Sequence, residues 1–259
     1  MSTPFDAAIA AIAKARYHNH RLETHSDIVS DGIVEDLKAT CEAFRRDVDD
    51  GAVRIWKNVG SPGDRERRVD LFVGQADADG NPDMTTVRIA IENKSVITAH
   101  RNRTNRFDDL KKVVAAVQGA RPEALVIATV LIGLANRVLN IPDQVHKFYR
   151  DREDEFDEKI RPRLSSGDQS LFTEFSWAIS KNSAIDPQRT LEMFRTLPTR
   201  GSAETYKVAY DSVLLVPVRI DNVSAPELAR VNGLGVDVDA DYRTFLTRTC
   251  RGYVARWHM

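Results

Sequence analysis

Three charged residues, Asp70, Glu92 and Lys94, lie in segments whose other residues suit buried β-strands. Residues 87–96 read VRIAIENKSV, and because side chains alternate between the two faces of a strand, Glu92 and Lys94 share one face. Asp70 lies within residues 67–74, RRVDLFVG, out of phase with the apolar residues beside it. If the two strands form a hairpin, both carboxylates and the amine meet on one face.

This grouping has a definite chemistry. Two neighbouring carboxylates repel each other and share a proton unless a cation lies between them. Mg²⁺ suits a site with few hard oxygen ligands, because it keeps several waters and bridges to substrate phosphates. A partly buried lysine beside such an ion can orient or deprotonate the attacking water. Asp70, Glu92 and Lys94 therefore predict metal-assisted hydrolysis of a phosphodiester.

The elements that must position these residues follow one another as helix, strand, strand, strand, helix and strand. Apolar periodicity, turn signals such as Asp79-Gly80, and a helix cap at Ser26 or Asp27 mark their limits. The six predicted segments are residues 26–48, 52–60, 67–74, 85–96, 104–117 and 124–133. This order predicts an α/β fold whose mixed sheet contains a three-stranded meander and a crossover.

The remaining segments are mostly predicted as helices. They cover residues 5–15, 142–164, 171–181, 187–197 and 239–257. A late strand is expected over residues 210–221, at a sheet edge because Pro217 cannot donate to a ladder. We divide the chain into a core, residues 1–135, and a helical extension with a late strand, residues 136–259. The extension is expected to complete the same domain and to contribute to recognition or dimerisation.

Asp70, followed by a hairpin and then Glu92-Asn93-Lys94, resembles the motif of the PD-(D/E)xK nuclease superfamily, to which many restriction endonucleases belong. The family core has the element order described above. The resemblance covers about residues 26–133 and implies a restriction-endonuclease-like core with additional C-terminal helices.

The resemblance also implies a role for each residue. The acids of the second and third strands, Asp70 and Glu92, would bind Mg²⁺ together with the backbone carbonyl of Asn93. The strand lysine would assist the attacking water. An acid of the first helix often completes such a site, and Glu35 takes that place here, with Asp31 as the alternative.

The acid-x-Lys pattern alone is common. It occurs four times in this sequence, beginning at Asp36, Glu92, Asp109 and Asp157. Only the second lies in a predicted strand with an acid on the strand before it, whereas the others suit solvated faces of helices. Val69 also stands where the motif has its proline. The alternative is an edge strand or a half-exposed strand whose outer face carries a Glu–Lys ion pair against Asp70 or Arg88.

A basic loop follows the third strand directly. His100, Arg101, Arg103 and Arg106 are expected to bind the DNA backbone, and a guanidinium group can donate two hydrogen bonds to one phosphate. The helix N-terminus beside them adds a favourable dipole for a phosphate. The alternative is a solvated loop whose arginines pair with neighbouring acids such as Asp108.

Composition sets further limits. The 259 residues carry a net charge of −1, so nucleic-acid binding requires a local patch. The longest apolar run, residues 124–135, is shorter than the roughly 20 residues of a membrane span. The N-terminus lacks the pattern of a signal peptide. Two cysteines, Cys41 and Cys250, are expected as thiols in a reducing cytoplasm.

Together these features predict a Mg²⁺-dependent endonuclease that hydrolyses DNA phosphodiester bonds. By resemblance it is a type II-like restriction or defence enzyme, acting as a homodimer because two strands require two sites. A cognate DNA methyltransferase is a further partner that the resemblance implies. Two alternatives stay open: a repair, recombination or RNA-directed nuclease on the same core, and a nucleic-acid-binding protein that does not cleave.

Overall fold

A six-stranded mixed sheet organises the chain, with strand order β1-β2-β3-β4-β7-β8. Its strands are β1 (Arg54–Ser61), β2 (Asp64–Gly74), β3 (Ile89–Val96), β4 (Leu125–Gly133), β7 (Ser212–Arg219) and β8 (Glu227–Leu228). The first three strands form an antiparallel meander, whereas β3, β4 and β7 run parallel to one another. A separate antiparallel pair joins β5 (Arg137–Asn140) to β6 (Ala178–Lys181).

The structure is a computed structural model. It describes residues 2–14, 23–61, 64–97, 100–140, 143–166, 168, 170–174, 178–201 and 204–258. The helices are α1 (Pro4–Lys14), α2 (Glu23–Thr40), α3 (Glu42–Asp49), α4 (Arg103–Ala120), α5 (Asp143–Tyr149), α6 (Glu153–Lys159), α7 (Arg161–Ser165), α8 (Ser170–Glu174), α9 (Asp186–Arg195) and α10 (Val238–Trp257). Two 3₁₀ turns, η1 (Met84–Thr86) and η2 (His100–Asn102), precede β3 and α4.

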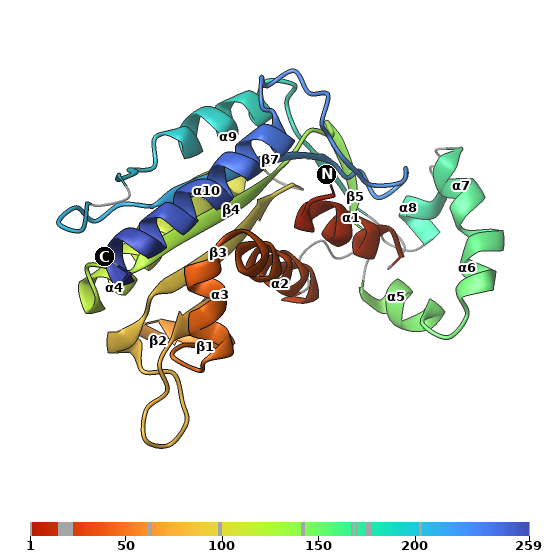
Figure 1. The fold of residues 1–259 in the computed structure, drawn as a ribbon. Coiled ribbons are helices and arrows are strands. Elements are labelled where there is room, and N and C mark those ends of the chain that lie inside the picture. The colour runs from red at the N-terminus through yellow and green to blue at the C-terminus, as the bar shows by residue number, and fades with distance from the viewer. Residues whose placement is uncertain are drawn as a thin grey trace.

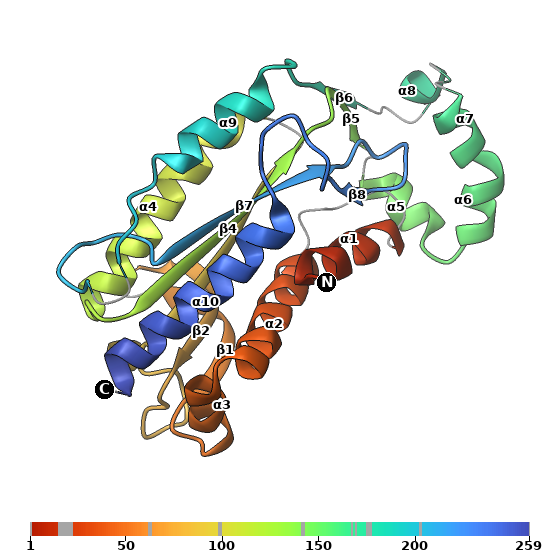
Figure 2. The same ribbon diagram turned by 45° about the horizontal axis from the view of Figure 1, so that its top comes forward.

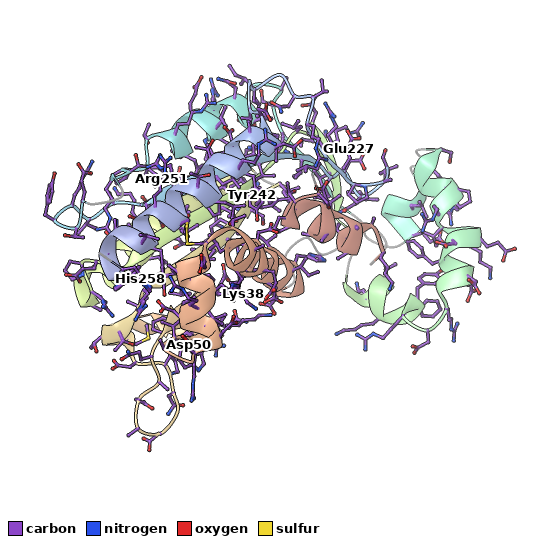
Figure 3. All side chains as sticks on the ribbon, viewed as in Figure 1. Lys38, Asp50, Glu227, Tyr242, Arg251 and His258 are labelled. Atoms are coloured by element: carbon purple, nitrogen blue, oxygen red, sulfur yellow. A yellow bond between two sulfur atoms is a disulfide. The ribbon has the colours of Figure 1, made fainter. Side chains whose placement is uncertain are left out.

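Helices cover both faces of the sheet (Figure 1). The rotated view shows α2, α3 and α10 on one face, with α4 and α9 on the other (Figure 2). One main hydrophobic core extends from Phe5 in α1 to Tyr253 in α10, so the two ends of the chain share it. Figure 3 shows Tyr242 on the side of α10 near α2, where its hydroxyl donates to the Asp36 carboxylate at 2.6 Å.

Helices α5 to α8 form a small lobe beside the sheet, on the right in Figure 1. It has its own apolar cluster, which consists of Leu139, Val145, Phe156, Ile160 and Leu171. The elements of the C-terminal half thus contribute to two separate hydrophobic clusters. β7, α9 and α10 contribute to the main core, whereas α5 to α8 surround the small cluster.

The predicted mixed sheet, with its meander and crossover, is confirmed. β4 reads LVIATVLIG, and nearly every residue of it is buried because helices pack on both of its faces. β3 is likewise a central strand, since β2 and β4 flank it. This position excludes an edge strand, although the Glu92–Lys94 ion pair that the alternative expected is present and the end of β3 is only half-buried.

The predicted helix over residues 26–48 is two helices. Cys41 has the extended backbone angles φ −127° and ψ 93°, and this residue separates α2 from α3. The apolar stripe continues across the break through Leu37, Cys41 and Phe44, all of which are buried. Periodicity therefore could not reveal the break. α2 also begins at Glu23, so Ser26 lies inside the helix and does not cap it.

Two predictions in the C-terminal half are wrong. The charged helix expected over residues 142–164 is broken into α5, α6 and α7, because the chain turns back to bury Phe156 and Ile160 in the small cluster. The helix expected over residues 171–181 ends at Glu174 with α8, and β6 then pairs with β5. Long-range pairing of this kind overrides local helix propensity.

β7 does not form the edge of the sheet, contrary to the expectation from Pro217. β8 pairs with its last two residues, Val218 and Arg219. The carbonyl of Pro217 accepts a hydrogen bond from the Ala229 N–H at 3.0 Å. A residue's nitrogen and carbonyl point to the same side of a strand, so the proline nitrogen faces this two-residue strand, where little of the ladder is lost.

Cys41 and Cys250 form a disulfide between the α2–α3 junction and α10, which corrects the expectation of two free thiols (Figure 3). The two residues are 209 positions apart, and no spacing rule connects them. Among the described residues, no helix has the length and apolarity needed to cross a membrane.

Candidate functional site

β2 and β3 separate at the two predicted acids. The ladder between them ends at the pair Leu71 and Ile91, so Asp70 and Glu92 are the next opposed positions. One carboxylate oxygen of Asp70 occupies the gap and accepts a hydrogen bond from the backbone N–H of Asn93 at 2.6 Å. The N–H and C=O of one strand residue point to the same side, so the Asn93 carbonyl faces this gap as well.

Glu92 is buried, with a relative exposure of 2%. Its Oε1 accepts a short hydrogen bond from the Lys94 Nζ, and the Lys94 side chain is mostly buried too. Its Oε2 makes no hydrogen bond with any described residue. A buried carboxylate oxygen without a partner is costly, and it marks a position where a cation would be stabilising.

The protonation of both acids reflects this environment. Burial, and next the charge of Asp70, raise the pKa of Glu92 from 4.5 to about 7, although Lys94 opposes the rise. Burial also raises the pKa of Asp70, despite the hydrogen bond from Asn93 and the charge of Lys94. Two acids that resist ionising together are the arrangement that a divalent cation relieves. The donor set of two carboxylates and a backbone carbonyl suits Mg²⁺.

The first helix does not supply the acid that was predicted. Glu35 is exposed on α2 and pairs with Lys38 at 3.1 Å, and Asp31 pairs with Lys57 at 2.6 Å. The structure therefore contradicts the expectation that Glu35 completes the site. Asp27, which was expected only as a helix cap, is the acid of α2 whose charge contributes to the raised pKa of Asp70.

Asp27 lies on the same helix as the predicted acids, one turn before Asp31 and two turns before Glu35. No sequence pattern links Asp27 to the motif. Which turn of α2 faces β3 is decided by how the helix packs, and local sequence does not show this. Within the described part of the chain, no three His, Cys, Asp or Glu side chains are grouped closely enough to form a metal site by themselves. A bound Mg²⁺ would therefore keep several waters.

The basic loop is only partly exposed. His100 is buried at 1% exposure, and its two ring nitrogens contact the Thr190 hydroxyl at 2.7 Å and the Gly133 carbonyl at 2.8 Å. Burial lowers the pKa of His100, which favours the neutral ring. These contacts contradict the expectation that His100 binds DNA. It anchors the loop to β4 and α9 instead.

The arginines of this segment differ in their exposure and in their ion pairs. Arg103 pairs with Asp186 at 3.3 Å and is mostly buried, so it ties α4 to α9. Arg106 is more exposed and pairs weakly with Asp109 at 3.6 Å. Arg101 is exposed and makes no ion pair with a described residue. Arg101 and Arg106 are therefore the better candidates for contacts with a phosphate.

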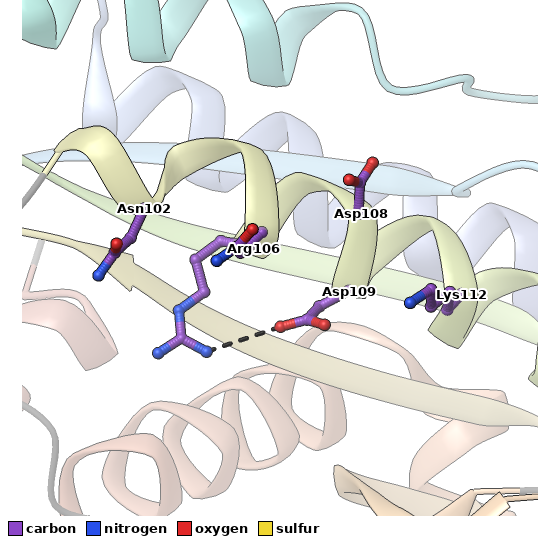
Figure 4. A pocket seen from close by; sticks show the side chains of 6 residues that line it. Asn102, Arg106, Asp108, Asp109 and Lys112 are labelled. Carbon is purple, nitrogen blue, oxygen red and sulfur yellow. Dashed lines mark ion pairs between the residues drawn. The ribbon is translucent and has the colours of Figure 1, made fainter.

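A polar hollow of about 480 Å³ lies along the outer side of α4. Figure 4 shows Arg106 extended beside Asp109, with the ion pair between them. The described residues that line it are Asn102, Asn105, Arg106, Asp108, Asp109 and Lys112. Their spacing of three and four residues places them on one side of the helix. Asp108 and Asp109 reduce the positive charge of this surface, so Arg106 and Lys112 do not form a purely basic groove.

Comparison of the chain with protein-family models, with curated proteins and with solved structures found no match. The geometry of Asp70, Glu92 and Lys94 and the order of the elements around them therefore indicate the function.

Proposed function

We propose that this protein is a Mg²⁺-dependent endonuclease of the PD-(D/E)xK type that hydrolyses DNA phosphodiester bonds. The observation that carries the proposal is the buried Glu92. It lies opposite Asp70 where two strands separate, contacts Lys94, and keeps one carboxylate oxygen without a hydrogen bond. A bound cation explains this oxygen and this pair of acids more simply than a contribution to the stability of the fold does.

The roles of the residues follow from their positions. Asp70, Glu92 and the carbonyl of Asn93 would hold Mg²⁺, which when bound supplies a Lewis acid for a phosphate oxygen and neutralises the two carboxylates. Lys94 is mostly buried and lies beside Glu92, so its amine can orient the attacking water and hold or release a proton. Arg101 and Arg106 would bind the DNA backbone.

The fold supports the same proposed function. α2, the meander of β1 to β3, α4 and the parallel β4 follow one another in the order of a restriction-endonuclease-like core. β7 and α10 extend this core, and α5 to α8 form an appended lobe suited to target recognition. The same proposal includes a type II-like restriction or defence role and action as a homodimer. It also includes a cognate methyltransferase as partner and a cytoplasmic location.

The direct test is incubation of the purified protein with supercoiled plasmid, short duplexes, single strands and RNA in the presence of Mg²⁺. We expect cleavage of duplex DNA, and we expect Asp70→Ala to abolish it. Lys94→Ala should reduce the rate by about 10²- to 10⁴-fold, the usual contribution of proton transfer. Lys159→Ala is the matched control, because Lys159 ends the same acid-x-Lys pattern on the exposed helix α6. Equal cleavage by wild type and Asp70→Ala would refute the proposal.

A second prediction concerns the DNA contacts. Arg101→Ala and Arg106→Ala are each expected to weaken DNA binding and to reduce the slope of log K against log salt by about 1, as expected for one phosphate contact each. Fluorescence anisotropy without Mg²⁺, from 50 to 200 mM salt, measures both quantities. Arg45→Ala, on α3 across the sheet, is the control and should leave the slope unchanged. A slope that is unchanged in both loop variants would place the DNA elsewhere.

A further inference from the structure

The side chain of Asn93 is fully hydrogen-bonded, although the proposed site uses only its backbone. Its Nδ2 donates to the Ser26 Oγ at 2.9 Å and to the Ser30 Oγ at 2.8 Å. Its Oδ1 accepts a hydrogen bond from the Thr129 Oγ1 at 2.6 Å. An amide group has two N–H donors and one acceptor oxygen, so these contacts satisfy both ends of it.

The partners of Asn93 come from two other elements. Ser26 and Ser30 lie one turn apart on α2, and Thr129 lies on β4 in register with Asn93. The backbone N–H of Asn93 meanwhile donates to Asp70 at 2.6 Å. Asn93 therefore connects a helix and a strand to the point where β2 leaves β3.

Ser26 reinforces this connection. Its side chain also opposes the effect of burial on the pKa of Asp70. Asp70 thus receives a hydrogen bond from the Asn93 backbone, and its pKa also depends on a residue that the Asn93 side chain contacts. A change at Asn93 would act on Asp70 through both routes.

We infer that Asn93 is the positioning residue of this site, whose side chain fixes the β3 peptide so that its N–H holds the Asp70 carboxylate beside Glu92. Its consequence for catalysis rests on the proposed function, whereas the positioning itself does not. Misplacement of a catalytic group by about 1 Å can cost on the order of 10²-fold in rate. Loss of the hydrogen bond from the Asn93 N–H to Asp70 is therefore expected to lower the cleavage rate more than loss of a packing contact would.

A purely structural role would give a different pattern. A residue that only stabilises the fold loosens all of β3 when it is truncated, since the exchange of its amides then follows the same unfolding event. A positioning residue changes the amide at position 93 more than the amides around it. Hydrogen exchange at this amide therefore distinguishes the two roles without any need for metal or activity.

Amide hydrogen exchange, followed by NMR, provides the test. In Asn93→Ala we expect exchange at residue 93 to accelerate about tenfold or more, as for the loss of one good hydrogen bond, while Ile91 changes little. Thr129→Val, which removes only the donor to Oδ1, should have a smaller effect at the same amide. Ser95→Ala is the matched control, since Ser95 lies two residues further along the same face of β3.

Calorimetric titration with Mg²⁺ gives a second readout. We expect Asn93→Ala to weaken Mg²⁺ binding about tenfold because Asp70 is no longer held, and Ser95→Ala to leave it unchanged. Exchange at residue 93 that is unaltered in Asn93→Ala, or that accelerates equally throughout β3, would overturn the inference. A wild-type protein that binds no Mg²⁺ would count against the proposed function, and the exchange data would still decide the role of Asn93.

Discussion

Glu92→Gln is expected to stabilise the metal-free protein at pH 8 by about 3 kcal/mol while it removes Mg²⁺-dependent cleavage. The carboxylate is buried, and its pKa is raised from 4.5 to about 7 by burial and by the charge of Asp70. At about 1.4 kcal/mol for each pKa unit, holding this group ionised costs the folded state about 3 kcal/mol. Glutamine has nearly the same shape without the charge, but it is a poorer ligand for a hard cation.

The gain in stability depends on pH in a defined way. Glu92 stays protonated in the folded protein up to about pH 7, whereas in the unfolded chain it ionises near 4.5. Between these values the folded state binds more protons, so the stability of the wild type falls as the pH rises. Glutamine does not titrate. The two proteins should therefore be equally stable below pH 4.5, and the full difference should be present above pH 7.

Urea unfolding at pH 4, 6 and 8, without divalent metal, measures this difference. Glu35→Gln is the control: its carboxylate is exposed on α2 and pairs with Lys38, so the free energy of unfolding should change little at any pH. Added Mg²⁺ should stabilise the wild type and not Glu92→Gln. A glutamine variant that is less stable than wild type at pH 8 would show that the Glu92 charge is satisfied within the protein, and the argument for a cation would fail.

The sheet could be predicted because its signals are local. The alternating or continuous apolar residues of β2, β3 and β4 fix their type, and the Asp79-Gly80 turn, where Gly80 has φ +84°, precedes the return of the chain toward β3. Once these strands pair in register, Asp70 and Glu92 must oppose each other. Their proximity followed from the pattern without any information on tertiary contacts.

The helices around the site could not be predicted in the same way. Which turn of α2 faces β3 depends on the packing of the helix, so the α2 acid whose charge raises the pKa of Asp70 is Asp27, whereas Glu35 pairs with Lys38. His100 was expected to bind DNA from a basic loop, but its partners, Gly133 and Thr190, lie 33 and 90 residues away. Contacts of this kind appear only after the chain has folded.

The disulfide belongs to the same class of long-range contact, and its removal is expected to have the largest effect on stability. Cys41 and Cys250 close a loop of 209 residues. In the chain-entropy treatment such a loop restricts the unfolded state by about 5 kcal/mol at 25 °C. Reduction of the wild type should therefore lower the free energy of unfolding by about this amount, with a fall in the midpoint of urea denaturation.

Urea unfolding of the wild type, with and without a reducing agent, measures the effect directly. Cys250→Ser in oxidising buffer should match the reduced wild type, because Cys250 is only partly buried and serine is nearly its size. The reducing agent should then have no further effect on this variant. Disulfides are rare in a reducing cytoplasm, so the number of free thiols in protein purified under non-reducing conditions also tests the proposed location. Two reactive thiols in the native protein, with a midpoint that the reducing agent does not move, would show that α2 and α10 are held together by the core alone.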